Sequence, residues 1–350
     1  MAVAFGDPEV DISQALAEFR AAVPDAALLA CSTAGQILGP RVDPAPLVLA
    51  ICTFDSARVV SGFVHEDGSG SKALGTRLAA ELLHDAGQER IAGVMIFGGG
   101  LETNGSALVE GLMEVLPPGT PISGGLAGDG PRFEKTWVHC NGQSGQDCVA
   151  GFAVLGRSVR FRHGSEGGWD GFGPLRTITR SENNVLYELD GQPALGLYKQ
   201  YLGDRAQDLP GSALLFPLTV ISPDGHTSVV RTILSVDEQT QSMTFAGDVP
   251  QGWRSRLMWT TVESLMEGAS DAAEDASQHR IGLAVAVSCV GRRLVLGHRT
   301  DEEVECVVDV IGQDTPLIGF YSYGEISPVD GWCQLHNQTM TITTLTEISA

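Results

Sequence analysis

Short apolar runs recur along the chain and are separated by glycine, proline and polar residues. Runs that are rich in β-branched and aromatic residues and bounded by turn residues predict β-strands. Such runs occupy residues 27–32, 47–54, 59–65, 90–97, 148–155, 176–188, 214–221, 229–236, 243–246 and 280–287. The pattern therefore predicts strands in both halves of the chain.

Other segments place apolar residues at every third or fourth position, which is the spacing of one helix face. In residues 10–23, Ile12, Leu16 and Phe19 share such a face, and Pro24 ends the segment. Further helices are predicted at residues 69–85, 106–116, 193–202, 252–266 and 301–311. The small and acidic residues 267–278 are expected to form a solvated connector. Strands that alternate with covering helices predict an α/β fold with some α+β character.

Three stretches can be aligned without gaps, and they suggest that the chain repeats itself. They are residues 30–36, 123–129 and 319–325. The glycines that align are Gly35, Gly128 and Gly324. A polar acceptor follows each glycine, namely Gln36, Asp129 and Glu325. Extended similarity is what separates a repeat from chance, so the flanking segments decide the matter.

The flanking segments match for the second and third stretches. Each is preceded by a strand and a helix and followed by two more predicted strands. These strands are residues 136–141 and 148–155 in one copy, and residues 332–336 and 339–347 in the other. We therefore predict two related β-α-β-β-β modules with mixed sheets and an internal duplication. The alternative is that glycine and small residues simply end many strands. The two domains are expected at residues 1–160 and 161–350, with the boundary within 156–175.

The amino-acid composition and net charge make some classes of binding partner unfavourable. The chain has 350 residues, and its 43 acidic against 22 basic residues give a net charge of −21. This balance disfavours binding to nucleic acid or to anionic membrane surfaces. No signal peptide and no long apolar span is visible, and the seven cysteines show no CxxC spacing. We expect a cytoplasmic protein without disulfides or a thiolate zinc site.

Several motifs carry a resemblance to a known family. They are residues 124–129, 189–194, 216–218 with Arg231, 288–292 and 318–326. With these motifs the chain resembles the bacterial FIST family, which has an N-terminal and a C-terminal FIST domain. The resemblance covers residues 26–347, nearly the whole chain.

The resemblance implies a non-catalytic sensory protein. Such a protein binds a small ligand and reports to a separate histidine kinase, or to a diguanylate cyclase or phosphodiesterase. Amino acids are ligands proposed for the family, and some members are haem proteins that sense nitric oxide. We therefore expect ligand binding and signal transduction, with haem b as one candidate cofactor and an amino acid or other small metabolite without haem as the alternative.

The third aligned stretch is the most complete candidate for a ligand site. Tyr321 and Tyr323 project to one face of the predicted strand, and Glu325 follows its last glycine. In one interpretation Glu325 or Asp129 receives an ammonium group, while Arg292 or Arg231 pairs with a carboxylate. In the other, Glu325 caps a helix and pairs internally with Arg292.

Cys289 is the candidate for an enzymatic alternative, because a thiolate is favoured beside an arginine. The sequence supplies no recognisable base for it, so a buried thiol is the preferred interpretation. Cys289 is also included among the ligand-site residues. For haem, His163 is the preferred axial ligand, since it ends a strand next to two arginines and a glycine-rich loop, and His139 is the second choice.

Overall fold

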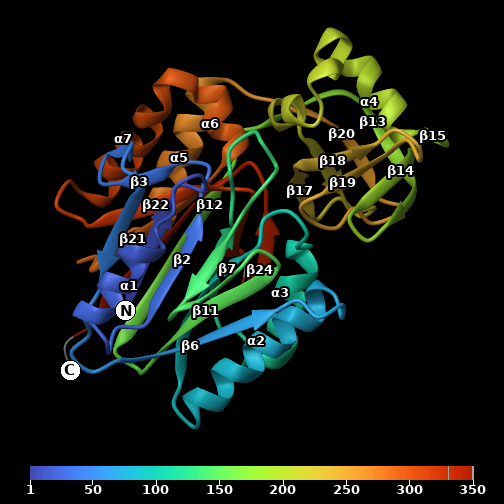
Figure 1. Cartoon of the computed structure of the whole chain (residues 1–350). Coiled ribbons are helices and arrows are strands. Elements are labelled where there is room, and N and C mark those ends of the chain that lie inside the picture. The colour runs from blue at the N-terminus through green and yellow to red at the C-terminus, as the bar shows by residue number, and fades with distance from the viewer. Residues whose placement is uncertain (330, 349–350) are drawn as a thin grey trace.

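The computed structural model describes residues 1–329 and 331–348, and three mixed β-sheets form its main body (Figure 1). Sheet I has the order β10 (Gln143–Gly145), β9 (Val138–Cys140), β2 (Leu28–Ser32), β1 (Ala2–Gly6), β5 (Leu47–Ile51). Sheet II has the order β24 (Trp332–His336), β23 (Gly324–Val329), β8 (Ile122–Leu126), β7 (Ile91–Gly98), β11 (Cys148–Leu155), β6 (Arg58–His65). Sheet III has the order β12 (Val159–Glu166), β25 (Met340–Glu347), β21 (Leu283–Cys289), β22 (Leu317–Ser322), β3 (Gln36–Leu38), β4 (Arg41–Asp43).

Sheets II and III have the same plan, which fits the predicted duplication. Each has a central parallel pair, β7 with β8 or β21 with β22, flanked on one side by two antiparallel strands and on the other by a hairpin. Sheet I repeats this plan around β1 and β2 but lacks the outermost strand. The α/β prediction with mixed sheets is confirmed, and the structure adds a third, shorter copy.

The hairpin that follows each parallel pair joins a different sheet. The hairpin β3–β4 follows β2 of sheet I and pairs with β22 of sheet III. The hairpin β23–β24 follows β22 and pairs with β8 of sheet II, and β9–β10 follows β8 and pairs with β2 of sheet I. These three exchanges form a closed ring. Both predicted domains therefore contribute strands to sheets II and III.

An aromatic cluster fills the space between the three sheets. Phe5 on β1, Phe97 on β7 and Phe320 on β22 contact one another, with ring centroids 4.7–5.4 Å apart. All three side chains are fully buried. Aromatic contacts of this kind add stability beyond the burial of their area. The apolar alternation along the strands therefore gives each sheet an inner face that meets the other two.

Helices cover the outer faces of the sheets. They are α1 (Ser13–Ala22) on sheet I, α2 (Ser71–Ala86) and α3 (Gly105–Val115) on sheet II, and α5 (Val262–Ala276), α6 (Val290–Leu296) and α7 (Thr300–Ile311) beside sheet III. The helices predicted from residues 10–23, 69–85, 106–116 and 301–311 are confirmed within a few residues at each end. No helix in residues 1–329 and 331–348 is long and apolar enough to cross a membrane.

The expectation for residues 252–278 was wrong. Residues 254–259 form β20 (Arg254–Trp259), and the helix α5 occupies most of the segment that was expected to be a connector. The small residues of α5 allow close packing, because a side chain at Gly164 of β12 would collide with the carbonyl oxygen of Ala272. Ala269, Ala272 and Ala273 are fully buried, so this alanine stripe is the core face of the helix.

A separate unit is inserted between β12 and α5 and lies at the upper right of Figure 1. Its sheet has the order β17 (Ser228–Arg231), β16 (Leu218–Ile221), β20, β13 (Asp170–Glu182), β14 (Val185–Leu189), β19 (Ser242–Phe245), β18 (Ile233–Asp237), with β15 (Gln192–Pro193) beside β14. The helix α4 (Ala194–Leu202) packs on this sheet around a core of its own, and it was predicted at residues 193–202.

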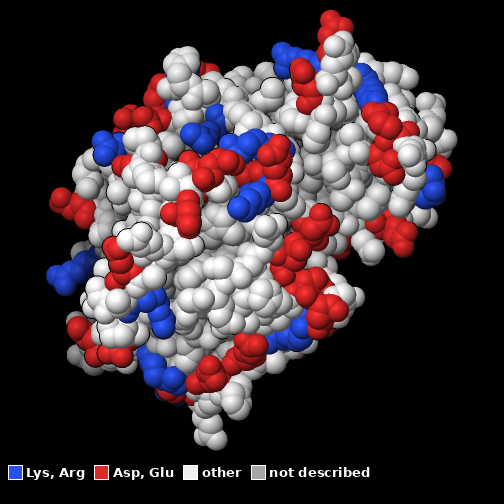
Figure 2. Space-filling view, viewed as in Figure 1, with Lys and Arg blue, Asp and Glu red and all other residues white. Residues whose placement is uncertain are grey.

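Figure 2 shows how charge is distributed over one face. Acidic side chains are spread over the main body and the inserted unit, and basic side chains lie among them. An uncharged area lies near the centre of this face. The net charge of −21 is therefore not confined to one tail or patch of the face shown.

Candidate functional site

The three aligned stretches are the turns where the chain leaves one sheet for the next, and they bond to one another. The Ala34 N–H donates to Tyr321 O at 2.8 Å, Tyr323 N–H to Leu126 O at 3.1 Å, and Gly128 N–H to Ser32 O at 3.1 Å. Each turn thus donates to the end of a strand from another copy. We call these residues, 32–36, 126–129 and 321–325, the turn ring.

The ring corrects the alignment of the three stretches by one residue. Its hydrogen bonds make Gly128 equivalent to Ala34 and Tyr323, whereas the sequence alignment placed Gly128 with Gly35 and Gly324. The shift arises because β8 stays paired with β7 until Leu126 lies opposite Gly98, as Ser32 lies opposite Gly6. Asp129 is therefore not the positional equivalent of Glu325.

Asp129 fixes the loop that follows β8. Its carboxylate accepts hydrogen bonds from the backbone N–H groups of Phe133, Glu134 and Lys135 at 2.8–3.0 Å. The hydroxyl of Tyr323 also donates to it, and the Tyr323 ring stacks on Phe133 with 4.8 Å between centroids. Burial, together with the Asp129 carboxylate, raises the pKa of the Tyr323 phenol. Tyr323 and Asp129, both predicted ligand-site residues, are therefore in direct contact with each other.

We expect Tyr323→Phe to lower the free energy of unfolding by about 1.5–3 kcal/mol, because it removes a hydrogen bond to a buried charge. Urea denaturation followed by circular dichroism measures this loss. Tyr198→Phe is the matched control, since the Tyr198 hydroxyl is equally buried but donates to the neutral carbonyl of Phe216 at 2.8 Å. A loss no larger than that of Tyr198→Phe would contradict the role assigned to Asp129.

Arg292 and Tyr321 share a partner, Glu303, which was not among the predicted site residues. Arg292 Nε donates to Glu303 Oε1 at 2.7 Å, and the Tyr321 hydroxyl donates to Glu303 Oε2 at 2.7 Å. Ser288 Oγ lies 3.2 Å from Oε2, and Arg292 also donates to the backbone carbonyls of Gly167 and Leu265. Arg292, Glu303 and Tyr321 are fully buried. We call these four side chains, at positions 288, 292, 303 and 321, the Arg292 network.

A signal for Glu303 was present in the sequence. Glu303 occupies a position on the inner face of α7 that Val304, Val307 and Ile311 share at helical spacing. A carboxylate within an apolar stripe requires a buried partner. The internal pairing expected for Arg292 therefore exists, but with Glu303 in place of Glu325.

Glu325 is buried, and no cation among residues 1–329 and 331–348 forms an ion pair with it. It accepts hydrogen bonds from Ser322 Oγ at 2.6 Å, from Thr339 Oγ1 at 3.0 Å and from the Thr339 N–H at 3.1 Å. Burial raises the pKa of Glu325 to about 8, and the hydrogen bonds offset only part of this effect. Glu325 is therefore mostly protonated at neutral pH, and it contributes hydrogen bonds instead of a charge.

Cys289 and Arg231 are also buried. Burial, with the neighbouring Glu325, raises the pKa of the Cys289 thiol, which opposes formation of a thiolate. Arg231 connects β17 of the inserted unit to sheet II, because it donates to the carbonyl oxygens of Asp248 at 3.0 Å and Leu335 at 3.1 Å. Direct contact of the predicted site residues with a ligand stays a prediction.

An open groove lies on the other side of the loop that Asp129 holds. It has a volume of about 610 Å³, within the usual range for small-molecule sites. Its walls are the first half of α1 with the preceding turn, and the segment that leads through β9 and β10. The residues that line it are Pro8, Glu9, Val10, Asp11, Ile12, Ser13, Leu16, Ala17, Arg20, Lys135, Trp137, His139, Gly142 and Ser144. We call it the α1 groove.

The α1 groove brings together charges of both signs around an apolar floor. Lys135 and Arg20 take part in no ion pair within the described residues. Asp11 contributes a carboxylate, and Ile12 and Trp137 contribute apolar surface. These residues form no motif in the sequence, because they come from two segments that are more than a hundred residues apart.

The fold and the buried turn ring define a class of protein with a pseudo-repeated α/β body and an inserted β-rich unit. The FIST N domain matches residues 1–192, and the FIST C domain matches residues 194–328. The chain belongs to the FIST family of sensory domains, as the motifs suggested. No catalytic family is among these matches.

Similar proteins occur in archaea and in bacteria. An uncharacterized protein of Methanocaldococcus jannaschii is 25% identical over 234 residues, which are 59% of this chain and 44% of the relative. An uncharacterized protein of Mycobacterium tuberculosis strain H37Rv is 26% identical over 352 residues, covering 95% of this chain and 86% of the relative. The chain thus spans less than half the length of the archaeal relative.

Proposed function

We propose that this protein is a non-enzymatic sensor that binds a small zwitterionic metabolite, such as a free amino acid, in the α1 groove. The observation that carries the proposal is a pair of cations, Lys135 and Arg20, in a groove of about 610 Å³. Neither cation has an ion-pair partner in the part of the chain that the structure describes. A ligand carboxylate can pair with Lys135 or Arg20, its ammonium group with Asp11, and its side chain can pack on Trp137.

The groove is connected to the turn ring by the loop that forms its wall. The backbone of Lys135 is held by Asp129, and the Trp137 N–H donates to Ser32 Oγ at 3.0 Å. Asp129 and Ser32 both belong to the ring, and Asp129 also binds Tyr323. A ligand that pulls on Lys135 therefore acts on the ring. We propose that Tyr321, Tyr323, Glu325, Arg292 and Arg231 relay binding without contacting the ligand.

The surroundings of His163, the predicted axial ligand, do not suit haem. His163 has a neutral imidazole, since burial lowers its pKa to about 4, and its Nε2 has no hydrogen-bond partner in the described residues. These two features suit an iron ligand. However, a side chain at Gly93 of β7 would collide with Phe161, and one at Gly164 would collide with α5. The strand β12 is therefore packed tightly on both faces, which leaves no slot for a porphyrin.

His139 lines the α1 groove, but both of its ring nitrogens are engaged. Its Nδ1 lies 2.7 Å from Ser144 Oγ, and its Nε2 accepts the Gly142 N–H at 3.1 Å. Iron binding at Nε2 would have to displace that backbone hydrogen bond. The version of the proposal without haem, and therefore without nitric oxide sensing through haem iron, is the one we adopt. A partner such as a histidine kinase or a cyclic-dinucleotide enzyme is part of the proposal.

We expect one or a few free amino acids to raise the thermal midpoint of the full chain, because a ligand that binds only the native state stabilises it. At a concentration of about 100 times the dissociation constant the stabilisation is about 2.7 kcal/mol. A thermal shift screen of the common amino acids, followed by titration calorimetry, measures this. Lys135→Ala should reduce the affinity about tenfold or more, since it removes the ion pair with the ligand carboxylate.

Lys199→Ala is the matched control, because Lys199 is on α4 of the inserted unit and does not line the groove. Ala17→Phe should block the groove without removing a charge. Ligand stabilisation that survives both groove variants would place the site elsewhere. A stoichiometric Soret band after addition of haem would support the haem version instead.

A further inference from the structure

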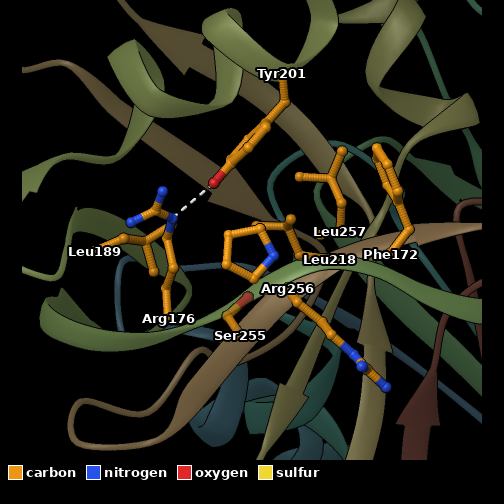
Figure 3. A pocket seen from close by; sticks show the side chains of 10 residues that line it. Phe172, Arg176, Leu189, Tyr201, Leu218, Ser255, Arg256 and Leu257 are labelled. Atoms are coloured by element: carbon orange, nitrogen blue, oxygen red, sulfur yellow. Dashed lines mark hydrogen bonds between the residues drawn. The ribbon is translucent and has the colours of Figure 1, made fainter.

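We propose that the inserted unit has a second ligand site, for a small monocarboxylic acid with an apolar body, in a cavity between β13, β20 and α4. This inference does not rest on the α1 groove. Figure 3 shows the cavity, with Tyr201 above it, Ser255 below, and Phe172 and Leu257 on the side opposite Arg176. Its volume is about 20 Å³, enough for about one water molecule in the closed form.

The cavity contains an unsatisfied hydroxyl. Ser255 is 1% exposed, and its Oγ has no hydrogen-bond partner in the described residues. Ser255 is on β20, between the pairing partners Arg176 and Val220, and its side chain points to the cavity (Figure 3). A buried hydroxyl without a partner is costly, so an acceptor placed in the cavity would be stabilised by it.

A second hydroxyl faces the cavity from α4's last turn. The Tyr201 oxygen accepts the Arg176 Nε–H at 2.8 Å, which leaves the Tyr201 proton free to donate elsewhere. The guanidinium of Arg176 also makes an ion pair with Asp190 at 3.0 Å, which holds it in place. Two hydroxyl donors and one guanidinium around one space favour an oxygen acceptor with negative charge, and a carboxylate has that chemistry.

The other walls are apolar apart from Arg256, whose guanidinium points away from the cavity (Figure 3). Pro174, Leu189, Leu218 and Leu257 line the cavity. They would pack against hydrocarbon and offer no partner to a second polar group. A ligand with one carboxylate and a short chain or single ring therefore matches the walls better than a sugar, a dicarboxylate or an amino acid.

The lip of the cavity is built to open. Phe172 pairs with Leu257 and Arg176 with Ser255, so the three residues 173–175 lie opposite Arg256 alone. Gly173 has a φ of +74°, a conformation that favours glycine. Phe172 and Leu175 are 47% and 41% exposed. Displacing this lip breaks few backbone pairs, and closing it over a ligand would bury exposed apolar side chains.

Benzoate is the probe that tests the proposal, with benzyl alcohol as the control that has the same ring and no carboxylate. Saturation-transfer NMR and calorimetry on the full chain should show that benzoate binds about tenfold or more tightly than benzyl alcohol. Ser255→Ala should weaken benzoate binding about tenfold, and Tyr201→Phe should do the same, because each removes a hydrogen bond to a charged group.

Ser181→Ala is the matched control on β13, since Ser181 lies outside the cavity and its change should leave benzoate affinity as it is. An unchanged thermal midpoint shows that the variants fold. No benzoate binding, equal binding of benzyl alcohol, or equal affinity in the Ser255→Ala and Tyr201→Phe variants would each overturn the proposal. Lys135→Ala should leave benzoate binding intact, so failure of this site and failure of the α1 groove are distinguishable.

Discussion

Arg292→Met is expected to lower the free energy of unfolding by about 3–5 kcal/mol, because it leaves the carboxylate of Glu303 buried without a counter-charge. Arg292 and Glu303 are both fully buried, and their ion pair is 2.7 Å long. Breaking such a pair costs far more than the pair itself contributes, since the remaining charge keeps its desolvation penalty. Urea denaturation of the full chain measures the loss.

The double variant Arg292→Met with Glu303→Leu should recover most of that stability, because apolar side chains of similar volume can replace a buried ion pair. Arg299→Met is the control at an exposed site: Arg299 pairs with Glu263 and Glu302 on the surface, so its replacement should lower the free energy of unfolding far less than Arg292→Met does. Equal losses for Arg292→Met and Arg299→Met would show that the Arg292 network is not the buried pair described above.

The second large effect is on pH dependence and arises from Glu325. Its pKa is raised from about 4.5 in the unfolded chain to about 8 in the folded one, mainly by burial. Between these values the folded state keeps a proton that the unfolded state has released. The contribution of Glu325 to stability is therefore complete below pH 4.5 and is lost as the pH rises to 8, at about 1.4 kcal/mol per unit.

Replacing Glu325 by glutamine should remove this loss. As the pH rises from 6.5 to 8, we expect the free energy of unfolding of Glu325→Gln to increase by about 2 kcal/mol relative to that of the wild type. Over the whole window from pH 4.5 to 8 the relative increase should be about 5 kcal/mol. The interval above pH 6.5 is the best one for this measurement. Below it the buried His163 and His336, whose pKa values are lowered to about 4, make stability rise with pH, which opposes the effect of Glu325. Denaturant titrations at several pH values measure the difference.

Glu110→Gln serves as the control, since Glu110 is an exposed carboxylate on α3. A stability difference between wild type and Glu325→Gln that stays constant from pH 6.5 to 8 would contradict the raised pKa. Both large predictions concern the same region, where the turn ring, the Arg292 network and the inserted unit meet.

Buried hydrogen bonds connect the turn ring and sheet II to the inserted unit. Gln338 donates to Leu214 O in the inserted unit at 3.1 Å, and Asn337 Nδ2 donates to Tyr323 O in the ring at 3.2 Å. Arg231 adds its bonds to sheet II. Buried polar contacts are directional, so a shift of the ring changes their geometry more than it would change apolar packing. We propose that the inserted unit reports the state of the ring to a partner protein.

The sequence by itself determined the class of fold and most of its elements. Alternation and helical spacing identified most strands of sheets I to III and the helices α1, α2, α3 and α7, because those patterns follow directly from which face is buried. The short strands β1, β3, β4 and β10 and the helix α6 were not predicted. The repeat was also visible, since each copy needs the same order of strand and helix. The failure at residues 267–276, which were expected to form a connector, has a specific cause: an alanine stripe resembles a polar connector unless the close approach of β12 is known.

Only the tertiary structure decided the site. The one-residue shift in the alignment of Gly128 depends on how far β8 stays paired with β7. The length of this pairing cannot be deduced from the residue types alone. The exchange of hairpins between sheets placed Tyr323 against Asp129, while α7 supplied Glu303 to Arg292. The α1 groove joins segments that are distant in the chain. Hydrogen-bond partners and cavities arise from packing between elements, whereas periodicity reports only which side of each element is buried.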